Sequence, residues 1–257
     1  MSGALAAAGI AGDPGSRVHR LDARAKLLGL AGLTVVAATS PPSAWPLLAC
    51  CAALLVCVAL AARVPARVIG RRALAVLPFV VLAAASLPFL HDGGARHAVG
   101  PLTASDAGLA VFGAAVAKAA VGTLSAVLLA ATTTVPAALD GLRRLHAPAL
   151  LVAIAGVTWR YAFVLAGEVA RMRAALAARG HRPRQLLHGG ATGRLAGALF
   201  LRAHARGERV HAAMAARGWR GVPVAPASAV LGRADVAFVA ALAGVPLLLR
   251  VLTAVPA

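Results

Sequence analysis

Residues 107–131 read AGLAVFGAAVAKAAVGTLSAVLLAA, an apolar run whose one charged residue is Lys118. A helix needs about 20 apolar residues to cross the hydrocarbon core of a bilayer, so this run predicts a membrane span. The composition of the whole chain points the same way, with 60% hydrophobic and 13% charged residues and a mean hydropathy of +0.82. Soluble domains are about 45–50% apolar and about 25% charged. We therefore predict an all-α integral membrane protein.

Four further apolar runs bring the predicted number of transmembrane helices to about five. The turn at Pro41-Pro42 separates the first two runs, which predicts a hairpin of helices. The first run is short, and Lys26 at its edge is expected to extend its ammonium group out of the lipid. The four runs are residues 25–39, 44–62, 73–90 and 230–255.

Positive charge is unevenly distributed along the chain, which carries 26 Lys and Arg residues against 8 Asp and Glu, a net charge of +18. In a soluble protein this excess would indicate a nucleic-acid partner, but in a membrane protein it marks the cytoplasmic loops. Arginines cluster before the first run and between the second and third, whereas residues 91–106 hold only Arg96. We therefore predict a cytoplasmic N-terminus and place residues 91–106 on the outer side.

Residues 132–229 hold 14 arginines and three acidic residues, yet they also carry apolar residues at helical spacing. A lipid-exposed span would not carry so many charges, so we predict a cytoplasmic insert of about three amphipathic helices. These cover 136–145, 148–180 and 194–218, with Pro183 and Gly189-Gly190 breaking the chain between the last two. The predicted organisation is a leader at 1–24, spans one to four at 25–131, the insert at 132–229 and the last span at 230–257.

A repeated decapeptide is the strongest signal within the insert. Residues 171–180 (RMRAALAARG) and 209–218 (RVHAAMAARG) are identical at seven of ten positions, and each copy closes a predicted helix. Glycine suits the left-handed residue that follows a helix end, so Gly180 and Gly218 could serve as caps alone. A third Ala-Arg-Gly, at 205–207, lacks the context, so the tripeptide by itself carries no information.

The alternative is a paired docking surface. A thin, alanine-rich helix end can enter a groove on a partner, and arginine suits a bidentate carboxylate there. Two similar ends, at Arg179 and Arg217, predict two similar grooves, supplied by a homodimer or by two paralogous subunits.

Several stretches together resemble the transmembrane T component of energy-coupling factor (ECF) transporters, in particular the cobalt/nickel type (CbiQ-like). The likeness covers most of the chain. The stretches are HRLDARAKLL at 19–28, TTTVPAALDGLRRL at 132–145, WRYAFVLAGE at 159–168, LFLR at 199–202 and both Ala-Arg-Gly helix ends.

The resemblance implies a subunit that joins a substrate-binding membrane S component to two cytoplasmic ABC-class ATPases, through three coupling helices between spans four and five. It implies a non-catalytic chain of the cell membrane that serves cobalt or nickel uptake, with ties to cobalamin biosynthesis. ATP and Mg would be held by the ATPases, and no cofactor or metal by this chain. The residues implied in ATPase docking are Ala178, Arg179, Gly180, Ala216, Arg217 and Gly218. Those expected to contact the S component or the membrane face are Arg160, Tyr161, Glu168, Leu199, Phe200 and Arg202.

Several other residues are candidates for a function, and each also has a structural interpretation. Lys118 could face the interior, pair with Asp106 and carry a function, or it could extend its ammonium group out of the lipid or support helix packing. His91, Asp92 and His97 could bind a metal at the outer face, although a solvated loop is the expected reading. Glu168 and Arg171 are spaced to pair on one helix, and Cys50, Cys51 and Cys57 are expected to be packing or lipid-facing residues.

Two rival functions stay open. A self-sufficient secondary transporter needs polar groups near the middle of its membrane spans. In the predicted spans, only Lys118 meets this requirement. A membrane-anchored scaffold would bind anionic lipid or nucleic acid through the basic insert. The apolar stripes of the insert favour protein partners and no nucleic acid.

Overall fold

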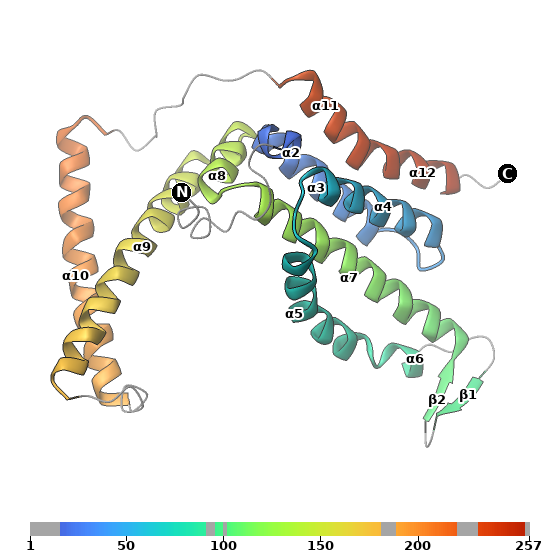
Figure 1. Ribbon diagram of the computed structural model, residues 1–257, viewed down its shortest axis with the longest axis horizontal. Coiled ribbons are helices and arrows are strands. Elements are labelled where there is room, and N and C mark those ends of the chain that lie inside the picture. Colours follow the sequence, from blue (N-terminus) through green and yellow to red (C-terminus); the bar gives the residue numbers. More distant parts are fainter. Residues whose placement is uncertain (1–15, 91–95, 100–101, 181–188, 220–230, 255–257) are drawn as a thin grey trace. The chain divides into compact units, whose positions relative to one another are not determined.

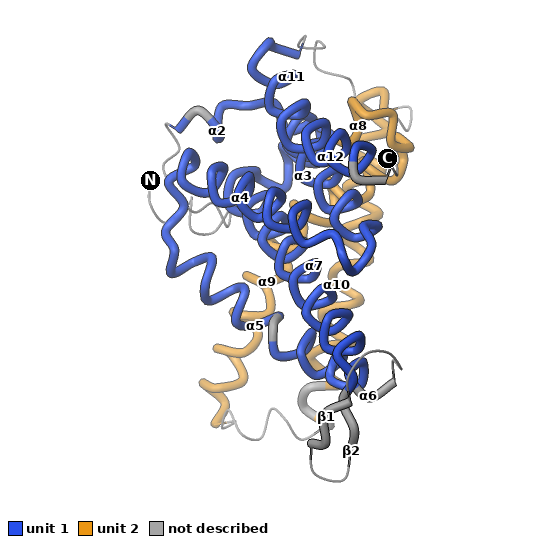
Figure 2. Tube along the Cα trace, turned by 90° about the vertical axis from the view of Figure 1, so that its right-hand side faces the viewer, with its two compact units in different colours: residues 1–141, 229–257 blue, residues 142–228 orange. Residues whose placement is uncertain are grey.

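The computed structural model describes residues 16–90, 96–99, 102–180, 189–219 and 231–254 (Figure 1). The chain divides into two units, one of residues 1–141 with 229–257 and the other of residues 142–228 (Figure 2). The described residues are helical apart from one short β-hairpin.

The first unit holds most of the apolar helices, which are connected by short turns. In chain order its helices are α2 (Arg17–Arg20), α3 (Ala23–Ala38), α4 (Trp45–Ala61), α5 (Ala66–Ala84), α6 (Leu87–Leu90), α7 (Asp106–Thr132), α11 (Arg233–Val239), the π-helical turn η2 (Ala240–Gly244) and α12 (Val245–Ala254). Helix α8 (Val135–Arg144) crosses the boundary between the two units.

The run 73–90 differs from its prediction as one span. Helix α5 already begins at Ala66, so Arg67, Arg71 and Arg72 lie in its first turns and not in a loop. The run is then interrupted after Ala84, and a separate short helix α6 follows. Pro88 has no amide hydrogen to donate to the carbonyl four residues earlier, which explains why one helix does not continue through the run.

The segment 91–106 was predicted as a loop, and part of it forms a hairpin. Strands β1 (Arg96–Val99) and β2 (Leu102–Ser105) pair in antiparallel fashion, with Arg96 opposite Ser105 and Val99 opposite Leu102. The Ser105 hydroxyl then accepts a hydrogen bond of 3.0 Å from the Gly108 amide and caps α7. The hairpin thus leads directly into the longest helix of this unit.

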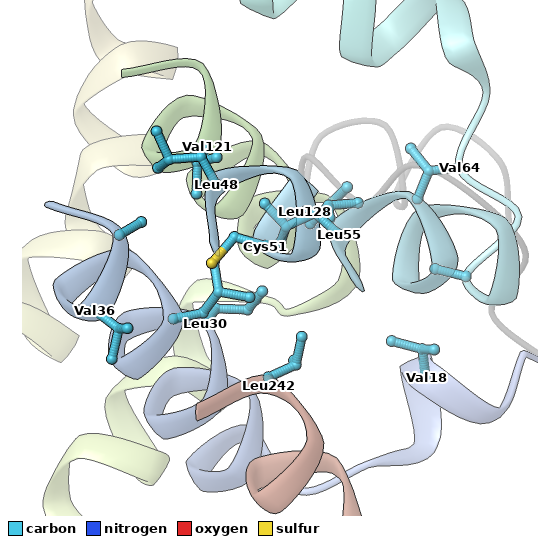
Figure 3. Packing of buried hydrophobic residues seen from close by; sticks show 14 of the residues in the cluster. Val18, Leu30, Val36, Leu48, Cys51, Leu55, Val64, Val121, Leu128 and Leu242 are labelled. Atoms are coloured by element: carbon cyan, nitrogen blue, oxygen red, sulfur yellow. The ribbon is translucent and has the colours of Figure 1, made fainter. Parts of the chain in front are cut away.

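The core of the first unit lies between α3, α4, α7 and η2. Leu33 is essentially fully buried there. So are Cys51, Leu55, Leu128 and Leu242, which Figure 3 shows. Helix α3 approaches the last helices closely because it presents glycine to them: a Cβ atom added at Gly32 would lie 2.8 Å from the Cβ of Ala243. Small residues allow membrane helices to pack at such short separations.

Among the described residues, three helical segments are long and apolar enough to cross a membrane: α7, α9 (Ala149–Ala178) and residues Arg233–Leu252 of α11, η2 and α12. Helix α4 is apolar but shorter. These helices support a membrane protein, while the count of five spans stays a prediction. Length and composition alone would allow α9 to span as well, so its place in a cytoplasmic insert stays a prediction.

The second unit consists mainly of α9 and α10 (Gly189–Ala216), which pack against each other. Helix α10 begins earlier than the predicted residue 194, and Gly189 and Gly190 lie within it instead of breaking the chain. The first amide groups of a helix have no hydrogen-bond acceptor within that helix. The first turn therefore depends least on the helix's own hydrogen bonds, and it tolerates glycine best. The first insert helix is α8, displaced by one residue from the predicted 136–145.

Candidate functional site

The two decapeptides end their helices with closely similar backbone geometry. Gly180 has φ 81° and Gly218 has φ 80°, so both adopt the left-handed conformation that the sequence predicts. The Gly180 amide donates to the Ala177 carbonyl at 3.0 Å, and the Gly218 amide donates to the Ala215 carbonyl at 3.0 Å. The repeat in the sequence is therefore a repeat of structure.

At the end of α10 the cap is a complete Schellman motif. The Trp219 amide donates to the Met214 carbonyl at 3.0 Å, in addition to the bond from Gly218. By contrast, the third Ala-Arg-Gly lies inside α10, where Gly207 is an ordinary helical residue. The helix therefore ends where the whole decapeptide is present, and the Ala-Arg-Gly tripeptide alone does not end it.

Both arginines at these ends are exposed, as are the alanines and glycines beside them. Within the described residues, no carboxylate lies within ion-pair distance of Arg179 or Arg217. A Cβ atom at Gly180 or Gly218 would meet nothing within 4 Å, so no other part of the described chain covers these ends. Each end therefore presents an unpaired guanidinium that can bind a carboxylate or another anion.

Glu168 connects the two helices of this unit. Its carboxylate pairs with Arg171 at 2.7 Å on α9, which confirms the predicted contact, and with Arg202 at 2.7 Å on α10. The hydrogen bonds from Arg171 and then from Arg202 lower the pKa of Glu168 below its ordinary range. We call these three residues the Glu168 clasp.

The clasp changes the interpretation of two predicted contact residues. Glu168 and Arg202 are each predicted to contact a partner or the membrane face, and in the structure they also pair with each other. The sequence could not indicate this, because the residues are far apart in the chain and only the i,i+3 pair has local spacing. Glu168 retains a side-chain exposure of only 14%, so little of it is available to a partner.

A groove of about 450 Å³ lies between α9 and α10, next to the clasp. Leu176 and Leu195 contribute to its apolar lining, while Arg179, Arg194 and Arg202 contribute positive charge. Arg179, at the end of α9, therefore lines this groove, whereas Arg217, at the end of α10, does not.

The remaining predicted contact residues lie on these same helices. Arg160 is exposed and Tyr161 half-buried on α9, while on α10 Leu199 is half-buried and Phe200 exposed. The Phe200 ring stacks on His204 with ring centroids 6.3 Å apart. None of these residues forms a cluster with the helix ends.

The first half of α9 exposes many apolar side chains that no other described part of the chain covers. No residue of α9 is buried, and Leu150 and Leu151 are 63% and 61% exposed. Ile154 and Val157 lie on the same face as Leu150 and are also exposed, and Phe163 is exposed on another face of the helix. Such a surface requires lipid or a protein partner.

Lys26 was expected to extend toward water, and this prediction is wrong. Lys26 is only 2% exposed, and its ammonium donates to the carbonyls of His19 at 3.1 Å and Thr132 at 3.0 Å. Nearby, the Asp235 carboxylate accepts hydrogen bonds from the amides of Asp22 and Gly232, each at 2.9 Å. The stretch 19–28 thus joins the beginnings of α3 and α11 to the end of α7.

Metal ligands do not gather among the described residues, where no group of three or more His, Cys, Asp or Glu side chains could hold an ion. His91 and Asp92 lie outside the described residues, and His97 is placed only as part of β1. The cysteines are free: Cys51 is buried, Cys50 half-buried and Cys57 exposed.

Comparison with known proteins relates most of the chain to one family. Residues 14–228 match the sequence profile of the family CbiQ, described as "Cobalt transport protein". The chain is also 39% identical over 203 residues to a protein of Rhodobacter capsulatus named "Cobalt transport protein CbiQ", covering 76% of this chain and 77% of that protein. The matched range includes both decapeptides and the clasp.

Proposed function

The chain belongs to the CbiQ family of cobalt transport proteins, and on that premise we propose that it is the T subunit of an ECF-type importer. In this role it transmits the motion of ATPases to a membrane S component that binds the substrate. The subunit itself is non-catalytic. The family name favours cobalt as the transported ion, and nickel is the alternative.

The observation that carries the proposal is the pair of matched, arginine-tipped helix ends. Two copies of one docking element suit two copies, or two close relatives, of one partner. Cytoplasmic ABC-class ATPases provide such a pair, with a carboxylate in each groove for Arg179 or Arg217. ATP and Mg would then be bound by the ATPases, and this chain would need no cofactor.

The exposed apolar half of α9 supports contact with the S component. Leu150, Ile154 and Val157 present a surface that a membrane partner could cover, and Phe200 provides a similar surface on α10. When ATP draws the two ATPases together, the two helix ends would move with them. Because the clasp binds α9 to α10, that motion would reach the S component and release its cargo inward.

This proposal places α9 at the cytoplasmic face, although its apolar half could span a membrane. Arg160 interrupts that half, Arg171 and Arg173 follow in the same helix, and Arg179 caps its end. Charges of this number favour an interfacial helix over a lipid-exposed span. The N-terminus would then be cytoplasmic in a plasma-membrane protein of about five spans.

The test is assembly with the ATPases in detergent. The double variant R179A/R217A should no longer co-purify with its co-expressed ABC-class ATPases, because each truncation at a buried charge pair costs about 2–5 kcal/mol. Arg206→Ala is the matched control, since it removes the arginine of an Ala-Arg-Gly that ends no helix. Continued assembly and transport by the double variant would contradict the docking role, and metal uptake by the chain alone would favour a secondary transporter.

A further inference from the structure

A groove of about 580 Å³ lies between α5 and α7 in the first unit. Its lining is almost entirely apolar, with Val76 from α5 and Val127 from α7 among the larger residues. One charged residue, Arg72, contributes to the lining. Neither the repeated helix ends nor the clasp lies in this unit, so the groove has no part in the proposed docking.

Small residues form one row of the groove's lining on α7. Gly122, Ala126 and Ala130 recur at every fourth position, so they share one face of the helix over about 12 Å. Ala126 and Ala130 are exposed, and no other described segment covers them. A shallow apolar channel of this kind can accommodate an extended acyl chain.

Arg72 lies toward the end of α7 and not toward its beginning. Helix α6, which follows α5, meets the start of α7, where a Cβ atom at Gly108 would lie 2.7 Å from the Cα of Pro88. Helices α5 and α7 therefore run in opposite directions, and the first turns of α5 lie near the end of α7 (Figure 1). Positive-charge placement predicts that this end is cytoplasmic.

The charge at this end is strong and unbalanced. Arg67 and Arg71 are exposed in the same turns of α5 as Arg72. Across the described part of the chain, no carboxylate pairs with any of these three arginines. A guanidinium binds phosphate oxygens in bidentate fashion, and the cytoplasmic leaflet is the anionic one.

We propose that this groove binds one anionic phospholipid, with its phosphate on Arg72 and one acyl chain along Gly122, Ala126 and Ala130. Arg67 and Arg71 add attraction for the headgroup. The groove thus combines the two chemistries of a phospholipid at the depth where the headgroup meets the hydrocarbon. The site is independent of the ATPase-docking proposal, because it requires only that the first unit lies in a bilayer.

For the experiment, the full chain is placed in nanodiscs that contain equal amounts of phosphatidylglycerol and phosphatidylcholine. Native mass spectrometry then counts the lipids that the protein retains after extraction. The wild type should retain one phosphatidylglycerol in preference to phosphatidylcholine. Arg72→Gln should reduce that preference by about fivefold, while Arg20→Gln, an exposed arginine outside the groove, should not. Equal retention of both lipids by the wild type, or an unchanged preference in Arg72→Gln, would overturn the proposal.

A second pair of variants tests the channel and does not depend on Arg72. Ala126→Trp should fill the groove and abolish retention, whereas Ala110→Trp, at an exposed site on α7 outside the groove, should leave it intact. Millimolar inorganic phosphate should not displace the lipid. Displacement of the lipid by phosphate would show that the site binds only an anion, and it would reject the acyl-chain channel. If the intact complex holds no lipid and Ala126→Trp loses a partner subunit, the groove binds a partner helix instead.

Discussion

Lys26 and Lys118, the two lysines of the chain, each donate hydrogen bonds at the end of the helix that carries the other. Lys26 on α3 reaches the carbonyl of Thr132, the last residue of α7, at 3.0 Å. Lys118 on α7 reaches the carbonyl of Ala38, the last residue of α3, at 3.3 Å, and also that of Ser40. An ammonium offers three donors and a positive charge to carbonyls that the helix leaves unpaired. Lys118 therefore supports helix packing, and the pairing with Asp106 is not formed.

Lys118→Met should destabilise the protein, because it leaves the carbonyls of Ala38 and Ser40 without their donor. Ser40 is buried whereas Ala38 is exposed, and a buried polar group that loses its partner costs about 1–3 kcal/mol. The measurement is the midpoint of thermal unfolding of the purified chain in detergent. Lys26→Met should show a loss of similar size and Arg20→Met none, so a wild-type midpoint for both lysine variants would show that these bonds do not matter.

Gly32→Ala should destabilise the first unit, although alanine is the better helix former. The added Cβ would lie 2.8 Å from the Cβ of Ala243, so α3 and η2 must separate, and overpacking of this kind costs about 1–3 kcal/mol. Gly70→Ala is the control, because nothing lies within 4 Å of its Cβ and the substitution should gain about 0.5–1 kcal/mol. Thermal unfolding in detergent should move in opposite directions for the two variants.

Gly180→Ala and Gly218→Ala should fray the last turns of α9 and α10. A residue with a Cβ atom pays about 1–2 kcal/mol to adopt the left-handed conformation that both glycines have. Hydrogen–deuterium exchange should therefore accelerate at the amides of residues 177–180 and 215–219. Gly207→Ala, in the interior of α10, should slow exchange or leave it unchanged, and equal behaviour of all three variants would refute the structural role of the caps.

The Glu168 clasp should open at acidic pH. Because the hydrogen bonds from Arg171 and Arg202 lower the pKa of Glu168 in the folded protein, its stabilising contribution is complete above the ordinary value of 4.5 and disappears as the pH falls through the lower folded value. Spin labels on A170C and A196C, in a chain whose native cysteines are replaced by alanine, would report the separation of α9 and α10. The distance distribution should be narrow at neutral pH and broaden in acid.

Glu168→Gln is the matched variant for this measurement. It cannot ionise, so its distance distribution should be the same at both pH values and as broad as that of the wild type in acid. A pH response that persists in Glu168→Gln would assign the transition to another group.

Local patterns accounted for those features that depend on neighbours in the chain. Residue spacing over a few positions predicted three such features: the helical fold class, the ends of α9 and α10 at the two decapeptides, and the Glu168–Arg171 pair. The helices α9 and α10 were likewise predicted from apolar residues at helical spacing, while their place in a cytoplasmic insert stays a prediction. The boundaries were less certain, as the early start of α5 and of α10 shows, because an arginine or a glycine is permitted both in a loop and in an opening helical turn.

The sequence by itself therefore determined that this chain is a helical membrane protein with two matched, arginine-tipped ends. Only the tertiary structure decided which distant residues meet: Arg202 with Glu168, Lys26 with the end of α7, Lys118 with the end of α3, and Arg72 with the small residues of α7. The physical reason is that spacing of a few residues is set by the geometry of one helix, whereas contacts across helices depend on how their faces pack. No pattern within a single helix encodes that choice.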